Sequence, residues 1–148
     1  MEALELDDRA DPSLPGRWRR PLGSWVEAAG GGPALVERVV LAVNEALSNA
    51  VEHGYRETAP GTVCLRARVG TPSLGATGAE DAPGAPGPHR MTLVVVVADH
   101  GRWRPPVTAS ACRGRGLAMI RALAESVDLA SSAEGTTVRM TWTLLDPA

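Results

Sequence analysis

Hydrophobic residues recur at three- and four-residue steps between Pro33 and Gly54, and this is the clearest periodic pattern in the chain. The apolar positions are Val36, Val39, Val40, Val43, Leu47, Ala50 and Val51. Their spacing puts them on one face of a helix, and proline suits a first helical turn. The pattern predicts an amphipathic helix that begins after Pro33 and ends at Gly54.

A second, shorter helical pattern lies upstream. Its apolar residues are Trp18, Leu22, Trp25 and Val26. Pro21 falls inside this stretch, and proline is disfavoured in a helix interior because it lacks an amide hydrogen and its ring clashes with the preceding turn. We therefore predict a helix over residues 20–29, which the glycines at 30–32 end.

Several runs rich in β-branched residues predict strands. Residues 61–69 and 91–98 are typical of neighbouring strands, and the second is almost continuously apolar, which indicates burial on both faces. The 70–88 segment between them holds five glycines and four prolines and predicts a flexible inter-strand loop. The other expected elements are an edge strand within 1–11, a helix over 116–124, and strands over 127–130 and 136–145.

The predicted order of elements is therefore β-α-α-β-β-α-β-β. Clusters of strands and helices in this order favour an α+β fold, a two-layer α/β sandwich in which helices cover one face of a mostly antiparallel sheet. With 148 residues and no internal repeat, the chain is expected to form a single domain over residues 1–148.

Composition narrows the range of partners. No apolar run approaches the roughly 20 residues that a membrane-spanning helix needs, so we expect a soluble protein without membrane contact. The 15 basic and 17 acidic residues give a net charge of -2, which does not support a general attraction for nucleic acid. Residues 1–8 are acidic, unlike the start of a secretory signal, so a cytoplasmic location is expected.

Lysine and cysteine chemistry are not expected to carry the function. The chain contains no lysine, so its basic side chains are arginines suited to bidentate contacts with phosphate or carboxylate. Cys64 and Cys112 lack the spacing of a zinc or redox site and are expected to be ordinary reduced thiols.

The second half of the long helix carries polar residues beside its apolar stripe. Glu45, Asn49 and His53 lie four residues apart, which places them on one ridge, with Asn44 and Ser48 nearby. Asparagine in a helix interior costs about half a kcal/mol relative to alanine. Taken alone, the ridge favours a solvated helix face. The alternative is a carboxylate that accepts a proton and an amide oxygen that ligates Mg²⁺.

Two more features lie later in the chain. The apolar strand leads to Asp99 and Gly101, and sites are commonly built where strands open into loops, although a strand-ending aspartate in a turn is equally compatible. Gly114 and Gly116 lie at the start of the predicted 116–124 helix, where amides and nearby arginines can bind phosphate, but glycine there is also ordinary turn chemistry. The sequence contains neither GxxxxGK[ST] nor GxGxxG.

The order of the motifs is more specific than any one of them. The segments are Glu45-x3-Asn49-x3-His53-Gly54, Asp99-x-Gly101, Gly114-x-Gly116-Leu117 and Gly135-Thr136-Thr137. This order resembles the N, G1, G2 and G3 boxes of the GHKL ATPase superfamily and, within it, the anti-sigma-factor serine/threonine kinases of the RsbW and SpoIIAB type. The resemblance covers almost the whole chain. It implies a Bergerat ATP-binding fold in which ATP lies between the N-box helix and a lid over residues 102–113.

The resemblance also implies roles for matching residues. Glu45 would be the catalytic base that takes a proton from a protein serine, and Asn49 would ligate Mg²⁺. Asp99 would accept a hydrogen bond from the adenine amino group, and Gly101 would let the backbone pass close to the base. The further nucleotide contacts that it implies are His53, Arg113, Gly114, Arg115, Gly116, Leu117, Thr136 and Thr137. Among them the two glycines would present amides to the phosphates, the two arginines would join Mg²⁺ in neutralising charge, and one threonine would support the adenine pocket. Arg102 and Arg104 could neutralise charge in the same way, although solvated charges of the lid are equally compatible.

One position departs from the family pattern. The G1 box usually reads DxGxG, but here Trp103 stands at the second glycine. Glycine at this point lets the lid backbone bend, and tryptophan reaches positive-φ conformations only with strain. The substitution leaves the rate of phosphate transfer open.

Two functions remain compatible with these residues. The first is a serine kinase that sequesters a sigma factor and phosphorylates a STAS-domain antagonist of the anti-sigma factor, and for it the resemblance implies a homodimer. Glu45 favours this enzyme. The second is a nucleotide-binding interaction module without phosphotransfer, for which Trp103 leaves room. A sensor histidine kinase needs a phosphoacceptor histidine on a dimerisation helix, and none of His53, His89 and His100 suits that task.

Overall fold

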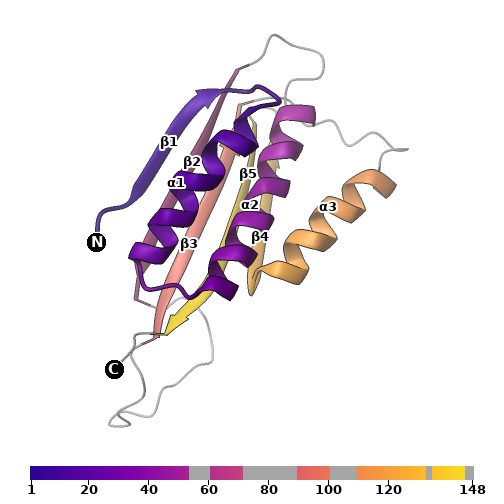
Figure 1. Ribbon diagram of the computed structural model, residues 1–148. Coiled ribbons are helices and arrows are strands. Elements are labelled where there is room, and N and C mark those ends of the chain that lie inside the picture. The colour runs from indigo at the N-terminus through magenta and orange to yellow at the C-terminus, as the bar shows by residue number, and fades with distance from the viewer. Residues whose placement is uncertain (54–60, 72–89, 101–109, 133–134, 146–148) are drawn as a thin grey trace.

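The computed structural model describes residues 1–53, 61–71, 90–100, 110–132 and 135–145. In these ranges five strands form one antiparallel sheet, and the helices lie together on one of its faces (Figure 1). The elements in chain order are β1 (Leu4–Arg9), α1 (Leu14–Ala28), α2 (Pro33–His53), β2 (Thr62–Gly70), β3 (Arg90–Asp99), α3 (Ser110–Leu123), β4 (Ser126–Ser132) and β5 (Gly135–Leu145). The predicted α+β sandwich and the order of its elements are confirmed.

The first two helices show where hydrophobic spacing outweighs a local signal. α2 has the predicted bounds, but α1 begins at Leu14 and contains Pro21, so the predicted start at residue 20 is wrong. The buried stripe of α1 is Leu14, Trp18, Leu22 and Val26, and Pro15 occupies its first turn. Burial of these four side chains outweighs the cost of an interior proline, which is about 3 kcal/mol.

α1 ends at a glycine in the left-handed conformation. Gly30 has a φ of 101°, and the amide of Gly31 donates to the Val26 carbonyl at 2.9 Å. This bond satisfies a carbonyl that the last helical turn leaves free, and glycine adopts such a φ without strain. The predicted stop at residues 30–32 is confirmed.

The strand order in the sheet is β1-β2-β3-β5-β4, which makes β3 the central strand. On β3, Leu93, Val95 and Val97 face the helices and are buried. The side chains between them alternate to the opposite face, where Val94 is buried and Val96 is half-buried. The predicted burial of β3 on both faces is therefore confirmed at Val94 and wrong at Val96.

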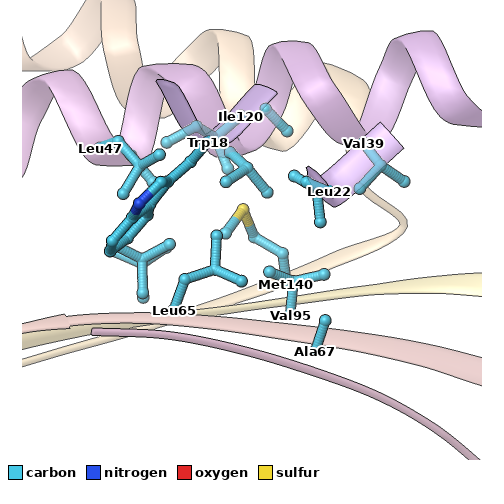
Figure 2. Packing of buried hydrophobic residues seen from close by; sticks show 14 of the residues in the cluster. Trp18, Leu22, Val39, Leu47, Leu65, Ala67, Val95, Ile120 and Met140 are labelled. Carbon is cyan, nitrogen blue, oxygen red and sulfur yellow. The ribbon is translucent and has the colours of Figure 1, made fainter. Parts of the chain in front are cut away.

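The hydrophobic core lies between the helices and the sheet. Figure 2 shows Trp18, Leu47 and Ile120 from the helical layer above Leu65 and Met140 from the sheet. All of these side chains have exposed fractions of 6% or less. The core therefore fixes α2 over the centre of the sheet. Within the described ranges, no helix combines the length and apolarity that a membrane crossing requires.

α3 begins at Ser110, six residues before the predicted start of this helix. Gly114 and Gly116 therefore lie inside the helix. Each glycine costs about 1 kcal/mol relative to alanine in a helix interior, which is why they resembled a break in the sequence. Once a helix has formed, each residue added to it gains one backbone hydrogen bond. Buried Ile120 fixes the carboxyl-terminal part of α3, so the helix can extend from there through both glycines. Most of the predicted 70–88 loop and residues 102–109 of the predicted lid lie outside the described residues.

Candidate functional site

Asp99 and Thr136 lie next to each other at one end of the sheet. They are partners in the register of β3 and β5, and both side chains point toward the helix-covered face. Their exposed fractions are 5% and 2%, and they are the buried polar residues of the described part of the chain. Burying polar groups is costly unless they are hydrogen-bonded. This end of the sheet therefore holds a carboxylate acceptor and a hydroxyl in a protected position.

β4 extends this polar row. Ser131 lies opposite Thr136 in the register of β4 and β5, and the Ser131 Oγ is 3.3 Å from the Thr136 Oγ1. Either hydroxyl can be the donor. Ser131 belongs to none of the motifs named above. The two-residue connection from Ser132 to Gly135 is the sequence signal that could have placed it opposite Thr136.

Thr137, the alternative to Thr136 in the same motif, points the other way. It pairs with Ala98 and Ala130 on the face that the described helices leave open. Because successive side chains in a strand alternate between faces, only one of the two threonines can face α2. The structure brings Thr136 to Asp99 and directs Thr137 away.

Glu45 and Asn49 lie on the flank of α2 that is turned away from α1. Asn44 lies against α1, beside a small gap whose lining includes Pro15 and Trp18. At 3.6 residues per turn, Asn49 is about 140° around the helix from Asn44. α2 packs against both α1 and α3, so Glu45 and Asn49 lie toward α3, and both are half-buried. The structure therefore separates Asn44 from the predicted ridge.

Four elements converge on the end of the sheet that contains Asp99. The second half of α2, the last residues of β3, the first residues of β5 and the start of α3 all lie toward this end (Figure 1). α2 also contacts β3 directly. Residues far apart in the sequence are thus brought to one end of the fold. Chemically, this region combines a buried acceptor at Asp99, a carboxylate at Glu45 and an amide oxygen at Asn49.

The other predicted contacts are described only in part. Gly114 and Gly116 are the fifth and seventh residues of α3, and Leu117 is half-buried. Amides beyond the first four residues of a helix donate to carbonyls four residues earlier, so the amides of both glycines are engaged within α3. Contact between these glycines and phosphate stays a prediction. The predicted contacts outside the described residues are Gly101 and the side chains of His53, Arg113 and Arg115.

Comparison with known proteins bears on the fold and the family of the chain. Residues 9–142 match the model of a family described as the histidine kinase-like ATPase domain. The chain is similar to the crystal structure of the RsbU and RsbW domains of Rv1364c from Mycobacterium tuberculosis, with a TM-score of 0.68 and 26% sequence identity. That match covers 100% of this chain and 34% of the other, so this chain spans about a third of its length.

A second similar structure is the histidine kinase domain of the blue-light activated histidine kinase from Erythrobacter litoralis EL346. Its TM-score is 0.47 and its sequence identity is 17%. The match covers 86% of this chain and 59% of that chain.

Proposed function

The chain belongs to the family of histidine kinase-like ATPase domains, and from this premise we propose that it is an ATP-binding anti-sigma factor with protein-serine kinase activity. It transfers the γ-phosphate of ATP to a serine of a STAS-type anti-sigma-factor antagonist and sequesters a sigma factor, as a homodimer. The family and the fold support the coarser statement, an ATP-binding regulatory domain of the kinase-like class. The observation that carries the nucleotide site is the buried pair Asp99 and Thr136.

Asp99 suits recognition of adenine. Its buried carboxylate can accept a hydrogen bond from the exocyclic amine of the base. Guanine has a carbonyl oxygen in place of that amine, which would set two acceptors against each other with no proton between them. A site built around a buried polar group rejects ligands that leave the group unpaired. Asp99 therefore favours ATP over GTP.

Glu45 is the catalytic base of the proposed transfer. The serine Oγ of the antagonist forms a bond to the γ-phosphorus of ATP, and the bond from that phosphorus to the β–γ bridging oxygen breaks. ADP leaves, and the serine proton passes to the Glu45 carboxylate. Glu45 lies half-buried on the same flank of α2 as Asn49, which supports this role.

Asn49 fits a contact with Mg²⁺. An amide oxygen is a ligand that Mg²⁺ accepts, and Mg²⁺ usually takes its other ligands from substrate phosphates and water. A single protein oxygen from the α3-facing flank of α2 is therefore sufficient. When bound, Mg²⁺ neutralises charge on the phosphate oxygens.

The proposed partners rest on the resemblance to anti-sigma-factor kinases and on the similarity to a structure described as that of RsbU and RsbW domains. Both Arg19 and Arg20 are exposed on α1 and border a groove of about 440 Å³ between α1 and α2. These arginines are available for contact with an acidic partner surface. The groove supports a protein-binding role for this face, apart from the nucleotide site.

The nucleotide site is tested by calorimetric titration of Mg-ATP and Mg-ADP. We expect micromolar binding by the wild-type protein and at least about tenfold weaker binding by Asp99→Asn, because the buried charge is lost. The control is Asp128→Asn, which removes an exposed carboxylate from β4 and leaves affinity unchanged. Absence of binding by folded wild-type protein would overturn the proposal.

The transfer step is tested with ATP labelled at the γ-phosphate and a purified STAS-domain protein that contains a phosphorylatable serine. We expect Glu45→Ala to retain Mg-ATP binding and to lower the transfer rate by about 10²–10⁴-fold, the usual contribution of a positioned base. Asp128→Ala removes an exposed carboxylate from β4, away from α2 and from the groove between α1 and α2, and serves as the control.

A regulatory module that binds nucleotide without phosphotransfer is the second candidate, and Trp103 at the second glycine of the G1 box favours it. In that case the wild-type protein binds Mg-ATP, but labelled phosphate never appears on the STAS-domain protein. The two candidates therefore differ in the transfer experiment and agree in the titration.

A further inference from the structure

We propose that Gly135 is a positioning residue for Asp99, because the absence of a side chain at Gly135 lets β5 begin directly against the Asp99 backbone. This inference rests on the proposed nucleotide site and deepens it. Gly135 would thereby affect the preference for adenine over guanine, because it positions Asp99.

The first observation is a close approach between backbones. Gly135 has a φ of 145°, a region that side chains rarely adopt. A Cβ built on Gly135 would overlap the carbonyl oxygen of Asp99, and it would lie 2.9 Å from the Cα of His100 and 3.0 Å from the carbonyl carbon of Asp99. All three are backbone atoms, so no side-chain rotation can relieve the overlap. Any larger residue at position 135 must therefore move the end of β3 or the start of β5.

The second observation is what such a movement would carry with it. Thr136 follows Gly135 directly, pairs with Asp99 across the sheet and lies within hydrogen-bond distance of Ser131. Asp99 is the last residue of β3. A shift at Gly135 therefore displaces the buried acceptor and the buried hydroxyl relative to each other. A displacement of about 1 Å in a positioned group can cost about 10²-fold in function.

The third observation is the packing between β3 and β5 deeper in the sheet. Deeper in the sheet, Val97 pairs with Val138 and Val95 pairs with Met140, and all four side chains are buried in the core. These rows hold β3 and β5 together independently of Gly135. A substitution at Gly135 is therefore expected to change the geometry of the site while cooperative unfolding is retained.

The chain offers a matched control for backbone strain. Gly30 also has a positive φ, 101°, but a Cβ built there meets no atom within 4 Å, and Gly30 lies at the far end of α1. Gly30→Ala therefore introduces strain at a positive φ without overlap and away from Asp99. Gly135→Ala introduces both strain and overlap.

The experiment measures Mg-ATP and Mg-GTP affinity together with the thermal midpoint for the wild-type protein and both variants. We expect Gly135→Ala to weaken ATP binding by about tenfold or more and to reduce the preference for ATP over GTP. Gly30→Ala is expected to lower the midpoint while leaving both affinities within about twofold. A purely structural role for Gly135 would lower the midpoint and leave the ATP-to-GTP ratio unchanged, and that result overturns the inference.

A second variant repeats the test with a different side chain. A φ of 145° lies outside the left-handed helical region that asparagine tolerates, and asparagine carries the same Cβ as alanine, so Gly135→Asn is expected to reproduce the loss of base preference. If the wild-type protein binds ATP and Gly135→Asn leaves the ratio of ATP to GTP affinity unaltered, the inference about Gly135 is contradicted but the proposed function is not. Failure of the wild-type protein to bind ATP contradicts the proposed function itself.

Discussion

Trp142 of β5 donates its indole N–H to the carbonyl of Leu123, the last residue of α3, at 2.8 Å. The indole is 1% exposed, so a core side chain also caps the end of a helix. The next amide, that of Ala124, donates to Ile120 at 2.8 Å. The carboxyl end of α3 is thereby fixed to the same strand that supplies Thr136.

Replacing Trp142 with phenylalanine should destabilise the fold. The change removes the donor to Leu123 and part of a buried aromatic side chain, so we expect a loss of about 2–4 kcal/mol in the free energy of unfolding. Trp25→Phe is the matched control. Its indole donates to the Glu2 carbonyl at 3.0 Å near the surface, where water can replace the bond. Denaturant unfolding that gives equal losses for both variants would contradict this explanation.

Asn44 and Asn49 should respond differently to the same substitution. The Asn44 Oδ1 is buried and has no hydrogen-bond partner among the described residues, so Asn44→Leu removes an unsatisfied acceptor. We expect unchanged stability or a gain of up to about 2 kcal/mol, measured by chemical denaturation. Asn49→Leu is expected to weaken Mg-ATP binding. A large loss of stability in Asn44→Leu would show that the buried oxygen has a partner in the folded protein.

Acid should selectively weaken the contact between β1 and α1. Arg17 donates to the Asp8 carboxylate at 2.6 Å, and this bond, together with the Arg9 amide, lowers the pKa of Asp8 below its usual value of 3.8. A carboxyl whose pKa is lower in the folded state contributes stability above its unfolded pKa. That contribution disappears as the pH falls through the folded pKa.

The corresponding measurement is thermal unfolding of wild type and Asp8→Asn between pH 7 and pH 2. We expect a small difference in midpoint near neutral pH, because the pair is partly exposed. This difference should fade as the pH falls below the usual pKa of 3.8. Asp128→Asn serves as the control, and an offset for Asp8→Asn that is constant across the whole range would contradict the prediction.

Cys64 should be an unreactive thiol at neutral pH. Burial, with a further contribution from the neighbouring Asp7 carboxylate, raises the pKa of Cys64 from 9.0 to about 11. At pH 8 only about a thousandth of the thiol is then ionised, and the thiolate is the reactive form. In a Cys112→Ser variant, alkylation of Cys64 should stay slow in the folded protein up to about pH 10 and become rapid when urea unfolds the protein. Fast alkylation of the folded protein at pH 8 would be inconsistent with this environment.

The strength of the hydrophobic pattern decided how well each element could be predicted. The predictions of α2 and β5 are accurate to within about a residue because their apolar spacing agrees with the residues that flank them. The predicted start of α1 was wrong because the cost of Pro21 is local, whereas the benefit of burying Leu14 and Trp18 depends on a sheet formed by distant residues. The predicted start of α3 was wrong for the same reason, because the local cost of Gly114 and Gly116 was given too much weight.

The residues of the proposed site could be named from sequence motifs, but their arrangement depends on strand register, which the motifs do not display. Asp99 could be named from the sequence because a carboxylate ends an apolar strand. Choosing Thr136 over Thr137 required knowing which strand face the helices cover. Ser131 and the contact between Gly135 and Asp99 follow from strand pairing, which a single sequence does not display.

The pairing of β3 with β5 has a consequence for the order of folding. Only two residues separate Ser132 from its partner Gly135 in the β4–β5 pair, whereas α3 and β4 lie between Asp99 and its partner Thr136 in the sequence. Contacts between residues distant in sequence form slowly because the entropy of closing the intervening loop must be overcome first. The two halves of the proposed nucleotide site are therefore expected to meet late. The appearance of ATP binding during refolding should accordingly lag behind the recovery of helical circular dichroism.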